Sequence, residues 1–261
     1  MSRALLALLC SGCALPAVSA GTFLPAGDLA AGDVHVSLSL EAGRVLAGPS
    51  DVGDLKGGTP PPAQQYEAST WVSSDLSLRW QASDRVTLEG QLKLTNPVMP
   101  FTPMVVGGAV GARVRLRHIP PTGGFALEIG GRLVGIAAEQ RIDRSSDIYS
   151  QTDVWNYRSL GIEMPLIATY RVNPIFAVTA SPFLRAYWIR AWHDVIVGLT
   201  TTRTSLAWSP VLSAGLGLAA AVDVGPVQLS PGAAVELVTK PGPDHATHFI
   251  FEPGIAVGTR F

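Results

Sequence analysis

The sequence predicts an all-β fold: a closed, antiparallel, up-and-down transmembrane β-barrel of about ten strands, within a range of eight to twelve. Three observations predict it. Apolar and polar residues alternate over segments of about nine residues, which is typical of strands that separate two environments. Short and long connections alternate along the chain. The apolar faces are nearly free of charge, whereas the polar faces combine small residues with charges of both signs.

The composition favours a membrane barrel over a soluble domain or a helical membrane protein. Charged residues make up 15% of the 261 residues, against about 25% in an ordinary soluble domain. The 27 Gly and 20 Pro are scattered among apolar stretches, which indicates many turns. Beyond the N-terminus the chain has no uncharged apolar run of about 18 residues, the length that a membrane helix needs. The net charge of −1 gives no reason to expect a nucleic-acid partner.

An export signal is expected at the N-terminus. Arg3 precedes an apolar stretch, and the small residues of AVSA then predict a signal peptide, 1–20, that is cleaved after Ala20. The stretch LLCSGCA also resembles a bacterial lipoprotein signal, which implies cleavage after residue 12 and a lipid on Cys13. Both interpretations stay open. Residues 21–33 are expected to form a periplasmic N-terminal segment, and residues 34–261 the barrel.

The first half of the chain contains five predicted strands. In residues 34–42, Val and Leu occupy one face while His, Ser and Glu occupy the other. Residues 68–80 follow with a less regular pattern. In 86–94, Val and Leu oppose Thr, Glu, Gln and Lys. Residues 106–117 set Val and Leu against three arginines, and residues 125–133 set Phe, Leu and Ile against Glu and Arg. Period-2 alternation of this kind predicts strands rather than helices.

The second half contains five more predicted strands, at residues 160–171, 176–192, 212–218, 227–237 and 249–261. Four of them alternate clearly. In residues 176–192 Arg185 and Arg190 fall on opposite faces, which predicts either a β-bulge or a position at the rim of the barrel.

The connections between these segments predict the topology. Four are short and contain the sequences ASDR, IPPTGG, VNP and DVGP. Five are longer, at residues 47–65, 96–104, 140–157, 193–205 and 240–247. Tight turns on the periplasmic side and longer loops outside are typical of an outer-membrane barrel. An even number of strands then places both termini on the periplasmic side.

The composition of the two faces separates a membrane barrel from a soluble barrel of the lipocalin kind, which would keep its apolar face inside. Small residues and paired opposite charges suit a narrow lumen. The predicted lumen charge network consists of Glu41, Glu89, Lys93, Arg113, Arg115, Arg117, Glu128, Arg132, Glu163, Glu236, Glu252 and Arg260. Its three neighbouring arginines either attract anions or fill the lumen through ion pairs with Glu89 and Glu128. We favour filling, because barrels of about eight strands have room for little more than side chains.

Two stretches resemble known families. The chain ends in GIAVGTRF, and its terminal Phe261 resembles the C-terminal signal that outer-membrane proteins present to the barrel-assembly machinery. The stretch LGIEMPLIATYRV, with Glu163 and Pro165, is similar to a Glu–X–Pro strand of small bacterial outer-membrane β-barrel families. The resemblance implies an integral protein of the bacterial outer membrane, with membrane lipids and the assembly machinery as partners. It implies no activity.

No set of catalytic residues stands out, so we expect no enzyme, no cofactor and no metal site. Omptin proteases carry paired acids in one outer loop and an Asp–X–His pair in another, but NPVMPFTPM has no acid and His193 adjoins Asp194 directly. His245 and His248 are interpreted as polar loop residues. We expect a narrow or filled barrel with a structural, adhesive or binding role through its external loops. The alternatives are a small pore for ions or small solutes, an outer-membrane enzyme acting on lipid or peptide, and a soluble periplasmic ligand binder.

Overall fold

The structure is a computed structural model that describes residues 29–47, 70–95, 104–117, 123–145, 150–205, 209–239 and 247–261. The signal positions Ala20 and Cys13 lie outside the described residues. The strands are β1 (Val34–Ala47), β2 (Thr70–Gln81), β3 (Val86–Thr95), β4 (Met104–Arg117), β5 (Gly124–Ser145), β6 (Ser150–Arg171), β7 (Phe176–Val197), β8 (Thr200–Ser205), β9 (Ser209–Val224), β10 (Val227–Thr239) and β11 (Thr247–Arg260).

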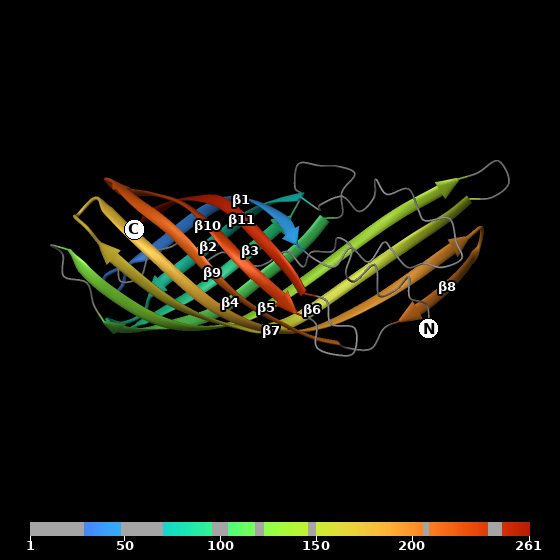
Figure 1. The fold of residues 1–261 in the computed structure, drawn as a ribbon, viewed down its shortest axis with the longest axis horizontal. Coiled ribbons are helices and arrows are strands. Elements are labelled where there is room, and N and C mark those ends of the chain that lie inside the picture. Colours follow the sequence, from blue (N-terminus) through green and yellow to red (C-terminus); the bar gives the residue numbers. More distant parts are fainter. Residues whose placement is uncertain are drawn as a thin grey trace.

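These strands form one closed antiparallel sheet, as predicted (Figure 1). Each strand from β1 to β7 pairs with the next along the chain, β9 pairs with β10 and β10 with β11, and β1 pairs with β11 to close the barrel. Both β8 and β9 pair with β7, over successive stretches of that strand. They therefore occupy a single position around the barrel, which has ten strand positions in all. The described residues contain no helix that is long and apolar enough to span a membrane.

Two of the expected external loops are strands instead. Each of β5, β6 and β7 is 22 residues long, and β7 turns directly into β8 at Gly198, which has a φ of 59°. The prediction of loops at 140–157 and 193–205 was therefore wrong for residues 140–145, 150–157, 193–197 and 200–205, which are strand residues. Backbone pairing of β5 with β6, of β6 with β7 and of β7 with β8 continues through these residues.

The longer strands form what we name the loop-side extension, made of residues 140–145, 150–155 and 193–205. It begins beyond Met104, where the pairing of β4 with β5 ends at Glu139. Beyond that point β5, β6, β7 and β8 pair with one another as a four-stranded sheet. Figure 1 shows these strands continuing past the others at the end of the molecule opposite the C-terminus.

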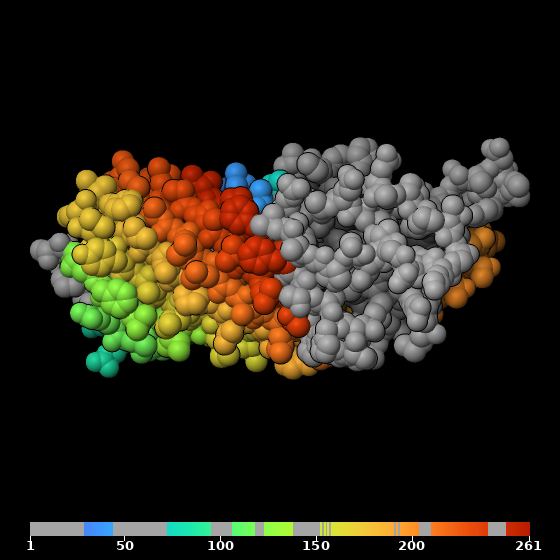
Figure 2. Space-filling view, in the orientation of Figure 1, coloured from blue at the N-terminus to red at the C-terminus, as the bar shows by residue number. Residues whose placement is uncertain are grey.

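Apolar side chains cover most of the outside of the barrel, whereas the inside contains most of the charged side chains together with smaller apolar clusters. The adjacent residues Arg132 and Leu133 show the inversion, since Arg132 is 3% exposed and Leu133 is 58% exposed. The same alternation runs along β1, where Leu38 and Leu40 are exposed while Ser39 and Glu41 are buried. We name the end of the barrel with the short connections the turn side and the opposite end the loop side. Figure 2 shows one face of the turn-side half of the barrel as a continuous surface.

Candidate functional site

A single row of backbone-paired residues carries charges around most of the lumen. We name it the charge row. Neighbouring strands align its members one opposite the next, in the order His35, Arg79, Glu89, Gly111, Arg132, Glu163, Arg185 and Ser213. Positive and negative side chains alternate along it, separated at one position by a glycine. The alternation places each buried charge beside an opposite one, which offsets its loss of hydration.

Ion pairs connect the charge row into a continuous chain. Glu89 accepts a contact from Arg113 at 2.6 Å and lies 3.6 Å from Arg132. Glu163 pairs with both Arg132 and Arg185. These side chains are nearly or completely buried, so each carboxylate holds two arginines in place on neighbouring strands.

Beyond Arg185 the chain of ion pairs crosses β9 to reach β10. Arg185 donates to Glu236 at 2.8 Å, and the Tyr187 hydroxyl lies 3.5 Å from the same carboxylate. The crossing depends on small inward residues of β9, because Arg185 is opposite Ser213 and Phe183 is opposite Gly215. The Arg185 guanidinium also lies 4.1 Å from the centroid of the Phe183 ring.

A second cluster lies nearer the loop-side end of the lumen. The Lys93 ammonium contacts Glu41 at 3.0 Å and Asp75 at 3.6 Å, and the Ser39 hydroxyl donates to Asp75 at 3.2 Å. Glu252 of β11 is 2% exposed in the same interior. One buried lysine thus serves several carboxylates from adjoining strands.

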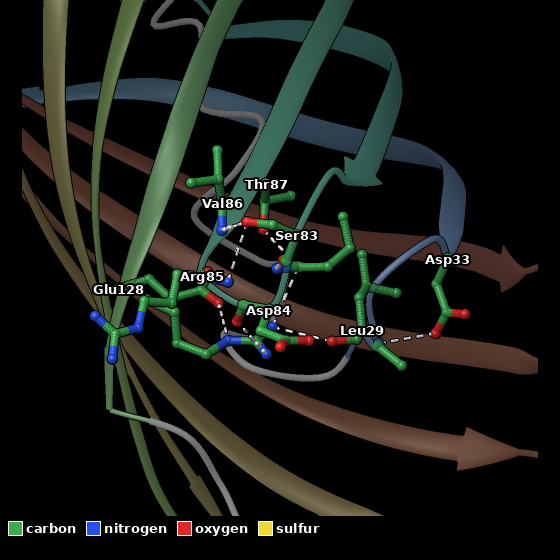
Figure 3. Close-up of polar contacts among 11 residues, drawn as sticks. Leu29, Asp33, Ser83, Asp84, Arg85, Val86, Thr87 and Glu128 are labelled. Atoms are coloured by element: carbon green, nitrogen blue, oxygen red, sulfur yellow. Dashed lines mark hydrogen bonds and ion pairs between the residues drawn. The ribbon is translucent and has the colours of Figure 1, made fainter.

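The turn-side end is closed by contacts from the N-terminal residues and a short turn (Figure 3). The guanidinium of Arg115 donates to Glu128 at 3.3 Å, to the Asp84 carbonyl at 3.3 Å and to the Leu29 carbonyl at 3.0 Å. Leu29 is 3% exposed, so the residues before β1 are held against the turn-side end of the barrel. The Asp33 carboxylate accepts from the amide of Ala30 at 2.9 Å, which supports the turn there.

Another cluster at the same end involves Asp223. Its carboxylate accepts from Arg171 at 2.9 Å, from Arg260 at 2.5 Å and from the Gln228 amide at 2.8 Å. These residues come from β6, β11 and β10, so one carboxylate ties three strands to β9.

The interior leaves little free space around the charge row. The cavity bounded by Ser77, Arg79, Glu89, Gln91, Arg113 and Arg132 has a volume of about 10 Å³. A single water molecule needs at least this much. The described side chains that line this cavity therefore leave room for no more than about one water molecule beside the charge row.

The structure places most of the predicted lumen residues inside the barrel and differs at one. Arg117 is exposed and lies 5.7 Å from the centroid of the Phe125 ring. The pairing of β4 with β5 shifts by one residue between Arg115 and Arg117. Because a one-residue shift exchanges the two faces of a strand, Arg117 points outward while Arg115 points inward.

Phe261 lies at the seam where the barrel closes. Its amide donates to the Val34 carbonyl at 2.9 Å, and its carbonyl accepts from the Val34 amide at 3.1 Å. The Phe261 residue is 75% exposed. The terminal aromatic is thus presented at the turn-side rim while its backbone completes the pairing of the first and last strands.

Sequence reasoning missed several members of the interior. Arg185 was left undecided between a bulge and the rim, although it has the same strand parity as the buried Phe183 and Tyr187. The pairing of β6 with β7 shows no register shift near it, so Arg190 points outward. Asp223 was also missed, although its parity matches that of Ser213 on the polar face of β9.

Comparisons with known proteins find similar solved structures only at low identity. No protein-family model matches the sequence, and no curated protein matches it. Of the solved structures, the outer membrane protease OmpT of Escherichia coli shares 11% identity with a TM-score of 0.47, covering 88% of this chain and 96% of its own. An outer membrane channel of Pseudomonas putida F1 shares 12% identity with a TM-score of 0.43, covering 91% and 100%. Ail of Yersinia pestis shares 12% identity with a TM-score of 0.31, covering 88% and 99%.

The location of the protein follows from its backbone pairing and from the composition of its two faces. Every strand position has a neighbour on both sides, which satisfies the backbone in lipid as only helices and closed barrels can. Exposed Leu, Val and Ile side chains cover most of the outer face between the two ends of the barrel, and most of the charged residues of the strands are buried inside. A soluble barrel has the opposite arrangement. The chain is therefore an integral β-barrel protein of the bacterial outer membrane.

Proposed function

We propose that the protein is a non-conducting barrel that acts by binding through its loop-side extension, rather than by transport or catalysis. The observation that supports this proposal most directly is the dense packing around the charge row. Glu89, Glu163 and the arginines around them are joined by ion pairs across neighbouring strands, and the cavity beside Glu89 has room for no more than one water molecule.

The loop-side extension supports the binding half of the proposal. The strands β5 and β6 continue about six residues beyond the end of β4, or roughly 20 Å along the strand direction. The hairpin tip at Leu199 is fully exposed, and residues 200–202 are exposed threonines. Asp194 and Arg203, which lie directly opposite each other on β7 and β8, brace the hairpin through two contacts of 2.6 and 2.8 Å. A paired sheet that rises above the membrane offers a pre-organised surface to a partner outside the cell.

Conductance in planar bilayers tests the non-conducting half. We expect the purified full chain to insert without steady single-channel steps, because the buried, ion-paired side chains of the charge row leave little room for hydrated ions. Steady steps of uniform size would contradict the proposal and favour the small pore.

A lumen variant makes this experiment sharper. The double substitution Arg132→Ser and Glu163→Ser removes one charge of each sign, so Arg185 keeps Glu236 and Arg113 keeps Glu89 as partners. We expect this variant to conduct ions where the unmodified chain does not. Heat-modifiable gel mobility shows whether the variant is a folded barrel before its conductance is compared.

An attachment assay tests the binding half. Deleting residues 141–144, 151–154, 194–197 and 200–203 together shortens the extension while keeping the remaining residues in register. Cells that display the full chain or this variant are compared on immobilised proteins and polysaccharides. We expect attachment to fall in the variant at equal amounts of folded barrel. Equal attachment by both forms would contradict a binding role for the extension.

A further inference from the structure

Two arginines lie directly opposite each other on the outer face of the barrel. Arg158 of β6 and Arg190 of β7 are paired in register, and both are exposed. Like charges placed opposite each other on neighbouring strands destabilise a sheet. The arginines inside the lumen do not have this arrangement, since the charge row alternates in sign.

The position of the pair relative to the membrane is set by its neighbours. Two residues toward the turn side, Leu160 is opposite Trp188, and they are 59% and 47% exposed. Two residues toward the loop side, Asn156 is opposite Trp192. The pair therefore lies between Trp188 and Trp192, next to the exposed Leu160. Tryptophans gather at the headgroup level of a bilayer, and the long connections mark this end as the external one.

The surroundings of the pair leave its charge available to an anion. In the same row, the neighbouring strands contribute Ala137 of β5 and Val106 of β4, which are small or apolar. Within the part of the chain that the structure describes, no ion pair involves Arg158 or Arg190. Arg158 lies 5.2 Å from the centroid of the Trp192 ring. By contrast, Arg203 of β8 is neutralised by Asp194 of β7.

We propose that Arg158 and Arg190 together bind the phosphate of an anionic lipid in the external leaflet. Guanidinium groups match phosphate geometry through paired N–H donors, and one phosphate between the two arginines offsets their mutual repulsion. The acyl chains of the same lipid then lie along Leu160 and its outward neighbours on β6. This site lies on the outer face of the barrel, so it is independent of the proposed binding role and of the packing around the charge row.

Lipid titration of the full chain in a non-ionic detergent, followed by native mass spectrometry, tests the site. The probes are dioleoyl phosphatidic acid, dioleoyl phosphatidylcholine and inorganic phosphate. We expect phosphatidic acid to bind more tightly than phosphatidylcholine. The double substitution Arg158→Gln and Arg190→Gln should weaken phosphatidic acid binding by about 5-fold for each arginine, or about 25-fold in total.

A matched variant controls for net charge. Arg117→Gln combined with Arg203→Gln removes the same number of exposed arginines, one from the turn-side end and one already paired with Asp194. This variant should bind phosphatidic acid as the unmodified chain does. Equal weakening in both variants, or none in the first, would overturn the proposal. Binding of inorganic phosphate as tightly as phosphatidic acid would also overturn it, by showing a site for free anions rather than lipids.

Discussion

Glu163 is the residue on which the charge row depends most. Its carboxylate pairs with both Arg132 and Arg185, and all three side chains are at most 3% exposed. Removing one member of a buried ion pair destabilises a protein strongly, because the remaining charge keeps its desolvation penalty and loses its partner. Here one carboxylate has two such partners.

We expect Glu163→Gln to lower the free energy of unfolding by about 3 to 5 kcal/mol, the usual effect of breaking a buried pair. Urea unfolding of the refolded barrel in lipid vesicles, followed by tryptophan fluorescence, measures the change. The matched control is Asp84→Asn, which removes a carboxylate from an exposed turn and should alter the free energy of unfolding by less than about 0.5 kcal/mol. Similar midpoints for the two variants would show that the charge row contributes little to stability.

The strands β4 and β9 have small residues at inward positions, which leaves space for long side chains from the neighbouring strands. On β4, Gly111 lies in register between Glu89 and Arg132. A Cβ at this glycine would lie 2.6 Å from the Arg132 Cγ and 2.3 Å from the Gly131 carbonyl oxygen. Arg132 therefore reaches Glu89 across the bare backbone of β4.

Gly111→Ala should destabilise the barrel by about 1 to 3 kcal/mol, as overpacking of a close-packed interior does. The clash involves backbone atoms, so side-chain motion alone does not relieve it. Gly131→Ala on β5 is the control, because nothing lies within 4 Å of a Cβ built there. The same urea unfolding measurement compares the two. If Gly111→Ala were as stable as Gly131→Ala, the interior would be looser than the described geometry.

The pairing of β1 with β11 closes the whole molecule, and Phe261 ends it. Its backbone bonds to Val34 persist whatever its side chain, and the exposed ring contributes little to packing. We propose that the barrel-assembly machinery recognises the Phe261 ring, and we therefore expect Phe261→Ala to reduce the amount of folded barrel in the outer membrane.

Refolding the same variant from urea into lipid vesicles provides the control for this prediction. Its unfolding midpoint should stay close to that of the unmodified chain, because the exposed Phe261 ring contributes little to stability. A loss of folded barrel in cells then reflects a defect in assembly. Heat-modifiable mobility in membrane fractions measures the amount of folded barrel in cells. Unchanged amounts of folded barrel in cells would contradict a role for Phe261 as an assembly signal.

Local pattern was enough to predict the strands and their two faces, because side chains alternate with a period of two in any strand. Leu38 and Glu41 are on the expected faces for that reason alone. The length of a strand beyond the membrane was not predictable in the same way. In residues 140–157 and 193–205, strand formation depends on a neighbouring strand being present at the same height, and that is a property of the assembled sheet.

Alternation, composition and connection lengths were thus sufficient to predict the barrel, its inverted faces and its approximate strand number. The tertiary structure decided which charges meet: that Glu163 lies between Arg132 and Arg185, that Arg117 turns outward, and that Arg158 faces Arg190. The reason is register. Each of these contacts joins residues on different strands, and closing the barrel sets the offset between strands all at once.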